Sequence, residues 1–161
     1  MSFMKHVYLP QDGVEICYSI QTTALLNKVE LKRLMTLLSP GFMTKLSSVQ
    51  SGMTDCVPLE IGPRLSFETP FSTNLVAICR RCGLDKVVRI ERSRRYRLPE
   101  GVDQAVFVAA HSDLKMETVY DTPIKTFDVE HTPQPAMIVP LMEQGIAGFD
   151  VVPEVFPFCL C

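Results

Sequence analysis

The sequence predicts a small two-layer α/β sandwich of the α+β type, in which helices cover one face of a mostly antiparallel sheet. Its length of 161 residues suits one domain with a substantial core. Its composition, with 47% hydrophobic and 21% charged residues, is that of a globular chain. Segments with a period of two residues alternate with segments at helical spacing, and this order favours such a sandwich.

The first predicted strand and helix lie near the N-terminus. Residues 14–20, VEICYSI, alternate between apolar and other side chains, which indicates a half-buried strand. A helix is predicted over residues 27–38, because apolar residues recur there at helical spacing ahead of a Pro-Gly pair. Asn27 is a suitable N-cap, and Glu30 follows three residues later, so this pair predicts a capping box.

A second strand is predicted after a polar stretch. Residues 44–55 are rich in Ser, Thr and Gly, which indicates a loop or a frayed short helix. The following CVPLEIGPR alternates from Val57 to Ile61. The strand is expected to end at Gly62-Pro63, because proline cannot donate a hydrogen bond to a sheet ladder.

The clearest helix is predicted in STNLVAICRRCGL. Ser72 or Thr73 is a suitable N-cap, and Gly83 occupies the position typical of a helix C-terminus. Apolar side chains recur at i, i+3, i+4 and i+7. Cys79 and Cys82 both belong to this stripe, which is expected to be buried.

The next segment, VVRIERSRRYRL, predicts a strand with two different faces. Apolar residues at even positions are expected to face the core; they are Val88, Ile90, Tyr96 and Leu98. Charged residues at odd positions are expected to face solvent; they are Arg89, Glu91, Arg95 and Arg97. Ser93 is expected to form a turn or a bulge.

A last helix is predicted from Asp103, a suitable N-cap, through Val106 and Phe107 to Leu114, with Met116 as its furthest apolar residue. From Asp128 onward the chain contains five prolines and is expected to be a linker, not a packed element.

The basic run within residues 80–97 has three interpretations. These residues carry eight basic and two acidic side chains, in a chain whose net charge is −2 and whose pI is about 5.9. A nucleic-acid surface usually adds exposed aromatic side chains or a basic domain, and neither is predicted here. A solvated or internally salt-bridged face is favoured, an interface with a protein or domain comes second, and no nucleic-acid partner is expected.

No set of residues predicts a metal site or an active site. Cys79 and Cys82 would need a second Cys or His pair at suitable spacing to bind zinc, so core cysteines are favoured. His6, His111 and His131 have no partner that suggests catalysis. The sequence contains no nucleotide-binding, serine-hydrolase or zinc-protease motif.

The same reading places the protein in the cytoplasm with no membrane partner. No apolar run approaches the ~20 residues that span a bilayer, and MSFMKHVYLPQDG lacks the core of a signal peptide. The six cysteines are therefore expected to be reduced.

Several motifs in residues 59–98 occur in a specific order. They are the turn Gly62-Pro63-Arg64, the helix start Ser72-Thr73-Asn74, and a strand in which Arg89 and Glu91 lead to Arg95-Tyr96. This order resembles the N-terminal region of phosphoribosylformylglycinamidine synthase (FGAM synthase, or FGAR amidotransferase), a large enzyme of purine biosynthesis. The resemblance extends from about Glu15 to Gly145.

The resemblance implies a role in an ATP-dependent glutamine amidotransferase and ligase. The family converts formylglycinamide ribonucleotide (FGAR), ATP and glutamine into formylglycinamidine ribonucleotide (FGAM), ADP, phosphate and glutamate. A glutaminase domain supplies ammonia to a synthetase centre that uses Mg-ATP. The N-terminal region is similar to the small PurS subunit of multisubunit versions, which implies a scaffold and not a catalyst.

The departures from the family pattern define the remaining expectations. The chain lacks the synthetase and glutaminase motifs and leaves the pattern after Gly145, so it is expected to be truncated and inert alone, with no cofactor of its own. The expected units are a PurS-like domain at 1–122, the start of an interdomain linker at 123–145 and a divergent, disordered tail at 146–161.

The resemblance also implies partners and contact residues. The expected partners are the synthetase and glutaminase domains, with self-association as a further option. Interdomain contacts are expected from Gly62, Pro63, Arg64, Ser72, Thr73, Asn74, Arg89, Glu91, Arg95 and Tyr96. The alternative is a freestanding module that docks on a full-length synthase, or on another protein, through a sheet edge or the basic face.

Overall fold

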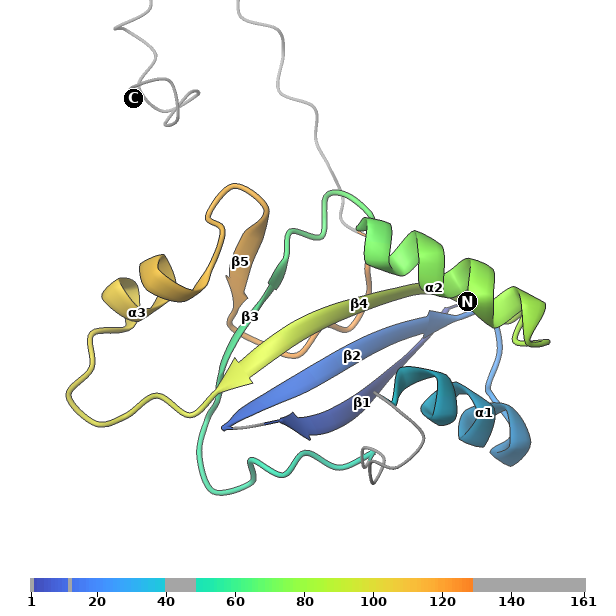
Figure 1. The fold of residues 1–161 in the computed structure, drawn as a ribbon, viewed down its shortest axis with the longest axis horizontal. Helices are drawn as coiled ribbons and strands as arrows, with labels where there is room; N and C mark the ends of the chain where they lie inside the picture. The colour runs from blue at the N-terminus through green and yellow to red at the C-terminus, as the bar shows by residue number, and fades with distance from the viewer. Residues whose placement is uncertain (1, 12, 40–48, 129–161) are drawn as a thin grey trace, which may run out of the picture. The chain divides into compact units, whose positions relative to one another are not determined.

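A five-stranded antiparallel sheet forms the centre of the domain (Figure 1). The computed structural model describes residues 2–11, 13–39 and 49–128. The strands are β1 (Phe3–Gln11), β2 (Val14–Thr22), β3 (Leu59–Pro63), β4 (Val87–Tyr96) and β5 (Glu117–Tyr120), in the order β1-β2-β4-β3-β5. The helices are α1 (Lys28–Leu38), α2 (Pro70–Arg81) and α3 (Gln104–His111).

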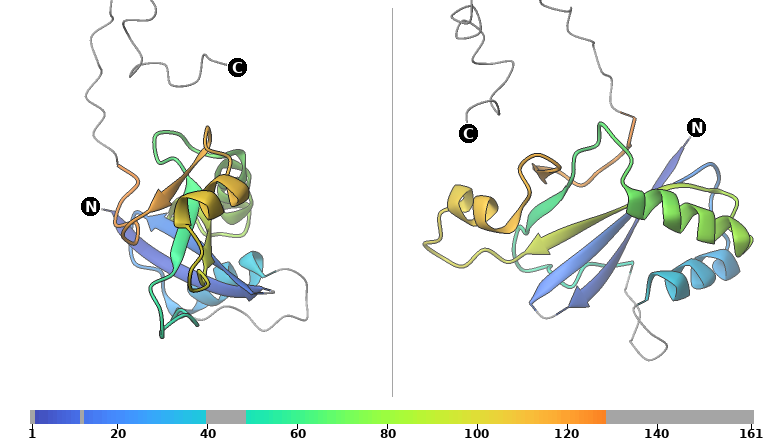
Figure 2. Two further views of the ribbon diagram at one scale, coloured as in Figure 1. Left: turned by 90° about the vertical axis from the view of Figure 1, so that its left-hand side faces the viewer. Right: turned by 45° about the horizontal axis from the view of Figure 1, so that its top comes forward.

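Helices α1 and α2 lie side by side on one face of this sheet, which confirms the predicted α+β sandwich (Figures 1 and 2). The core between these two helices and the sheet is apolar. Its buried members include Val7, Leu9, Ile20, Leu34, Val76, Cys79, Leu84, Val87 and Ile90. Burial of these side chains is the main source of stability for the domain.

The capping box of α1 is confirmed. The Asn27 side chain accepts hydrogen bonds from Val29 N and Glu30 N at 2.9 and 2.8 Å, and the Glu30 carboxylate accepts one from Asn27 N at 2.8 Å. The first backbone N–H groups of a helix have no partner within the helix, and local side chains here supply acceptors for some of them.

The N-cap of α2 is Thr69, so the prediction of Ser72 or Thr73 is wrong. The Thr69 hydroxyl accepts a hydrogen bond from Ser72 N at 3.2 Å, and Pro70 occupies the first helical position, where no N–H is needed. The Ser72 hydroxyl instead donates to Glu68 and accepts from Ile90 N, which ties α2 to β4. Gly83 ends the helix with φ +73°, as predicted.

Two predictions about β4 are also wrong. Glu91 and Arg95, expected to face solvent, are 1% and 9% exposed, whereas Val88 is exposed. The bulge lies where the pairing with β2 shifts between Gln21 and Thr22, opposite Val88, and not at Ser93. The shift lets Val87 join the core beside Ile90.

The last helix, α3, differs from the other two. Its N-cap is Asp103, as predicted, but the helix ends at His111, so Leu114 and Met116 lie outside it. None of its residues is buried. The predicted extent of this helix, to Leu114 or Met116, is wrong.

Two strands were not predicted. β1 pairs with β2 along its whole length, and β5 pairs with β3 at the other side of the sheet. Residues 121–128 then run along the face of the sheet opposite α1 and α2 (Figures 1 and 2). Ile124 and Phe127 are buried there, in the segment that the sequence assigns to a linker. Its continuation and the predicted tail at 146–161 lie outside the described residues.

Candidate functional site

Arg95 is held inside the domain by two carboxylates. The strand register places it opposite Glu15 of β2 on one side and Glu60 of β3 on the other. Its guanidinium contacts a Glu15 oxygen and lies 3.4 Å from Glu60 Oε2. Ser51 Oγ accepts a hydrogen bond from Arg95 at 2.7 Å. Both carboxylates are also buried, and one guanidinium leaves one negative charge over. Hydrogen bonds from Ser51 and Gly52 to Glu15, and from Ser93 to Glu60, stabilise the two carboxylates further.

Arg89 and Glu91 hold the chain where it enters α2. Glu91 accepts hydrogen bonds from Thr69 N at 3.1 Å and from the Thr69 hydroxyl at 2.6 Å. Arg89 Nε donates to Glu91 at 3.0 Å, and its guanidinium lies 4.6 Å from the centre of the Phe127 ring. For Arg89 and Arg95, the interpretation as an internally salt-bridged face, one of those favoured from the sequence, is confirmed.

The segment Gly62-Pro63-Arg64, predicted as a turn, comprises the end of β3 and the residue after it, and is also committed to internal contacts. A Cβ atom at Gly62 would lie 2.7 Å from the Tyr120 ring and 2.8 Å from Ser93 Cβ, so no larger residue fits without a shift. The Tyr120 hydroxyl donates to the Pro63 carbonyl, and Arg64 donates to the Leu114 carbonyl at 2.8 Å. The segment therefore joins β3 to β5 and to the loop before it.

The remaining predicted contact residues differ in exposure. Thr73 and Asn74 are exposed on α2 and are available to a partner, whereas Ser72 is buried. Tyr96 is half-buried and its ring packs edge-on against Phe107 and His111, at 5.3 and 5.8 Å between ring centres. Tyr96 thus fixes α3 to the end of β4.

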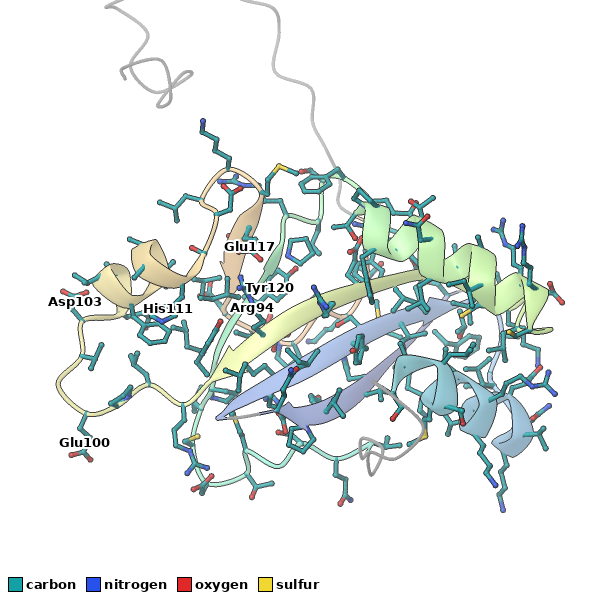
Figure 3. All side chains as sticks on the ribbon, in the orientation of Figure 1. Arg94, Glu100, Asp103, His111, Glu117 and Tyr120 are labelled. Carbon is teal, nitrogen blue, oxygen red and sulfur yellow. The ribbon has the colours of Figure 1, made fainter. Side chains whose placement is uncertain are left out.

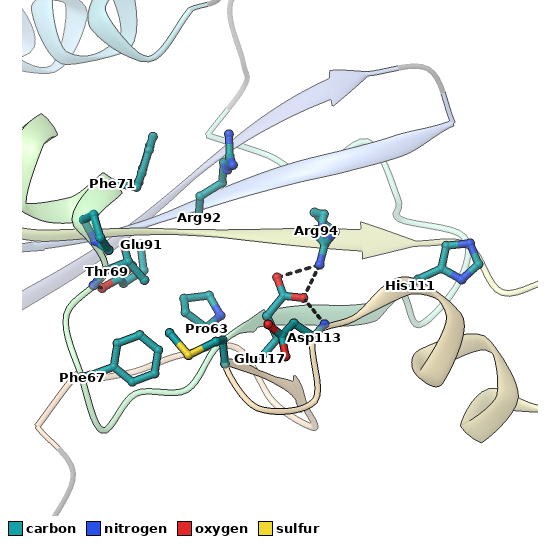
Figure 4. A pocket seen from close by; sticks show the side chains of 12 residues that line it. Pro63, Phe67, Thr69, Phe71, Glu91, Arg92, Arg94, His111, Asp113 and Glu117 are labelled. Atoms are coloured by element: carbon teal, nitrogen blue, oxygen red, sulfur yellow. Dashed lines mark hydrogen bonds and ion pairs between the residues drawn. The ribbon is translucent and has the colours of Figure 1, made fainter. Parts of the chain in front are cut away.

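An open groove of about 520 Å³ lies between α2 and α3 (Figure 4). We call it the β4–β5 groove. Its apolar walls are Pro63, Phe67, Pro70, Phe71 and Met116, and its charged walls include Arg92, Arg94, Asp113 and Glu117. α1 and α2 leave this half of the helix-bearing sheet face uncovered (Figure 1).

Two arginines give the groove its polar character. Arg94 Nη2 contacts both carboxylate oxygens of Glu117 at 2.6 and 2.5 Å, and the pair lies between β4 and β5 (Figures 3 and 4). Arg92 is exposed and its guanidinium lies 5.1 Å from the centre of the Phe71 ring. Sequence reasoning missed this groove, although two arginines at even positions interrupt the apolar pattern of the strand.

The surface beside the groove is apolar. Val106 is 67% exposed, Leu114 50% and Met116 48%. We call these residues, with Val102, the α3 surface. It adjoins the groove, because Met116 belongs to both. All four lie within residues 102–116, and apolar residues exposed near one another are more typical of a contact surface than single ones.

The described residues offer little for catalysis. They contain no group of three His, Cys, Asp or Glu side chains that could hold a metal ion. Burial raises the pKa of Cys17 to about 12 and that of Cys79 to about 11, which disfavours the thiolate that a nucleophile needs.

Within the described residues, no helix is long and apolar enough to cross a bilayer.

Known proteins match most of the chain. The model of the family described as formylglycinamide ribonucleotide amidotransferase N-terminal matches residues 15–126. A phosphoribosylformylglycinamidine synthase of Dictyostelium discoideum is 34% identical over 86% of this chain, and that of Homo sapiens is 38% identical over 75%. A probable chloroplastic or mitochondrial synthase of Arabidopsis thaliana is 47% identical over 55%. The matches cover 11%, 10% and 7% of those relatives, so the chain spans about a tenth of their length.

Proposed function

Since the chain belongs to the formylglycinamide ribonucleotide amidotransferase N-terminal family, we propose that it is the N-terminal scaffold domain of a phosphoribosylformylglycinamidine synthase. In this role it serves the ATP- and glutamine-dependent conversion of FGAR to FGAM without supplying catalytic residues. Its partners are the synthetase and glutaminase domains, which use the ATP, magnesium and glutamine.

The observation that carries the proposal is the exposed α3. The helix has eight residues, none of them buried, and isolated helices of this length are marginal in water. The α3 surface and the β4–β5 groove together offer apolar area and a few fixed charges. We assign the remaining nine-tenths of the synthase polypeptide as their occupant, because the relatives are about ten times longer than the matched region.

The proposal that the domain is inert alone rests on how its charged side chains are used. Arg95 pairs with Glu15 and Glu60, and Arg89 and Glu91 hold the start of α2. Groups engaged in this way keep the sheet rigid. They support a domain whose task is to present a surface of fixed shape.

Binding to a synthase that lacks its own N-terminal region tests the proposal. The Dictyostelium relative without its matching region and the full 161-residue chain should form a one-to-one complex in isothermal titration calorimetry. Val106→Asp with Leu114→Asp should abolish the complex, because both side chains lie on the α3 surface. Val57→Asp is the matched control, since Val57 is 95% exposed outside that surface.

Two results would overturn the proposal. One is a complex that is as tight with the α3 variant as with Val57→Asp. The other is turnover of ATP and glutamine by the chain with no other protein present, which would refute inertness.

A further inference from the structure

The outer faces of α1 and α2 form a second surface, which we call the basic helix surface. It consists of Lys28, Val29, Lys32 and Arg33 of α1 and Ile78, Arg80 and Arg81 of α2, all of them exposed. Arg33 Nη1 donates to the Cys82 carbonyl at 2.7 Å and so joins α1 to the end of α2. The surface lies at the end of the domain opposite α3 (Figure 1).

Four of the five cations of this surface have no ion pair among the described residues, whereas the fifth, Arg33, interacts electrostatically with Glu30. Within the described residues, no carboxylate oxygen lies within 4.0 Å of Lys28, Lys32, Arg80 or Arg81. The nearest ion pair is Glu30 with Lys86, at 2.9 Å. Five exposed cations therefore lie on these two helices, in a chain with a net charge of −2.

Apolar side chains lie among these cations. Val29 is 66% exposed and precedes Lys32 by three residues, so the two share a helix face. Ile78 is 47% exposed and has the same relation to Arg81. The surface thus combines positive charge with apolar contact area on both helices.

We propose that the basic helix surface binds an acidic segment of a second protein, one that also carries apolar side chains. Carboxylates of that segment pair with the free cations, and its apolar side chains cover Val29 and Ile78. Charge complementarity sets the sign of the partner, and the exposed apolar residues set its second property.

A nucleic acid fits this surface less well. A phosphate backbone would satisfy the cations but would leave Val29 and Ile78 in contact with water. Single-stranded nucleic acids are usually bound with aromatic side chains on which bases stack, and the basic helix surface has none. Anionic peptide and anionic polynucleotide are therefore distinguishable outcomes of one experiment.

Fluorescence anisotropy with defined probes tests the proposal on the full chain. The probes are short labelled peptides with Glu and Leu, Glu and Ser, or Lys and Leu in one helical pattern, and a single-stranded RNA of similar length. The Glu/Leu peptide should bind most tightly and should weaken as salt is added. The Glu/Ser peptide should bind more weakly, because it lacks the apolar contacts.

Charge reversal locates the site. Lys32→Glu with Arg81→Glu should weaken binding of the Glu/Leu peptide by about tenfold or more, by removing two pairs and adding repulsion. Lys115→Glu with Lys125→Glu is the matched control, because both lysines are exposed elsewhere and the net charge changes equally. Val29→Ser with Ile78→Ser should weaken binding several-fold without changing its salt dependence. Circular dichroism confirms that each variant is folded.

Three results would overturn the proposal. They are no binding of the Glu/Leu peptide at low salt, equal effects of the two charge reversals, and tighter binding of the RNA than of the Glu/Leu peptide. The last would assign the surface to nucleic acid. None of these results depends on the α3 surface, so the test is independent of the proposed scaffold role.

Discussion

Two groups of arginines from one basic run end in opposite environments. Arg95 of β4 is 9% exposed and lies between two buried carboxylates. Arg80 and Arg81, at the end of α2, are exposed and have no carboxylate partner among the described residues. The comparison teaches that a high density of arginines in the sequence does not decide whether they form internal ion pairs or remain exposed. What decides it is whether other parts of the chain cover the surface on which they lie.

The physical reason is the cost of burying charge. A guanidinium that Tyr8 and the loop at Ser51 remove from water must be paired, and the antiparallel register supplies Glu15 and Glu60 for Arg95. At a helix C-terminus water remains, and the helix dipole itself favours cations there. Arg80 and Arg81 thus need no partner for folding, which leaves them available for binding.

The largest expected effect comes from breaking the buried cluster. Arg95→Met should lower the free energy of unfolding by about 3–5 kcal/mol, because Glu15 and Glu60 would remain buried without a cation. Arg81→Met should change it by about 0.5 kcal/mol or less. Urea unfolding of the full chain measures both, and equal effects would contradict the comparison.

The next effect compares one glycine from each region. Gly62→Ala should lower the free energy of unfolding by about 2–3 kcal/mol, because its Cβ would meet Tyr120 and Ser93 below 3 Å. Gly83→Ala should cost about 1 kcal/mol, from its φ of +73° and a movable Arg33 atom at 3.2 Å. The same urea unfolding distinguishes them, and a larger loss at Gly83 would refute the close packing at Gly62.

The smallest effect is a pH dependence of the free energy of unfolding, which comes from His6. Burial is the largest cause that lowers the pKa of His6 below its ordinary value of 6.5. The unfolded chain therefore takes up a proton first as the pH falls, so stability is full above 6.5 and decreases below it. The loss should be less than about 1 kcal/mol, and His6→Gln should remove this part of it. Urea unfolding between about pH 7.5 and 5.5 measures it; an unchanged slope in His6→Gln would contradict the assignment.

Local signals predicted local structure well. The caps Asn27 and Asp103 and the terminal Gly83 are confirmed, because each depends on residues within one helical turn. Thr69 was missed as a cap because Ser72 and Thr73 offer equally good hydroxyls, and the choice is made by Glu91, which is distant in sequence.

The sequence pattern did not predict which distant segments of the chain cover each face of the sheet. Beyond the bulge at Val88, alternation in β4 separates its two faces correctly, but which face meets water depends on residues 121–128 and on loop residues near Ser51. The sequence did contain a usable signal. Glu15, Glu60 and Arg95 all stand at the polar positions of their strands, so antiparallel pairing of these strands can bring the three side chains to one face. Arg97, which pairs with Asp55 at the surface, is exposed as predicted.

One measurement tests the scaffold role most directly. A chimera of the Dictyostelium synthase, with its N-terminal region replaced by residues 2–128 of this chain, which include β1, should form FGAM from FGAR, ATP and glutamine. Val106→Asp with Leu114→Asp in the chimera should abolish FGAM formation, whereas Val57→Asp should preserve it. Full FGAM formation by a chimera carrying the α3 variant would contradict the account.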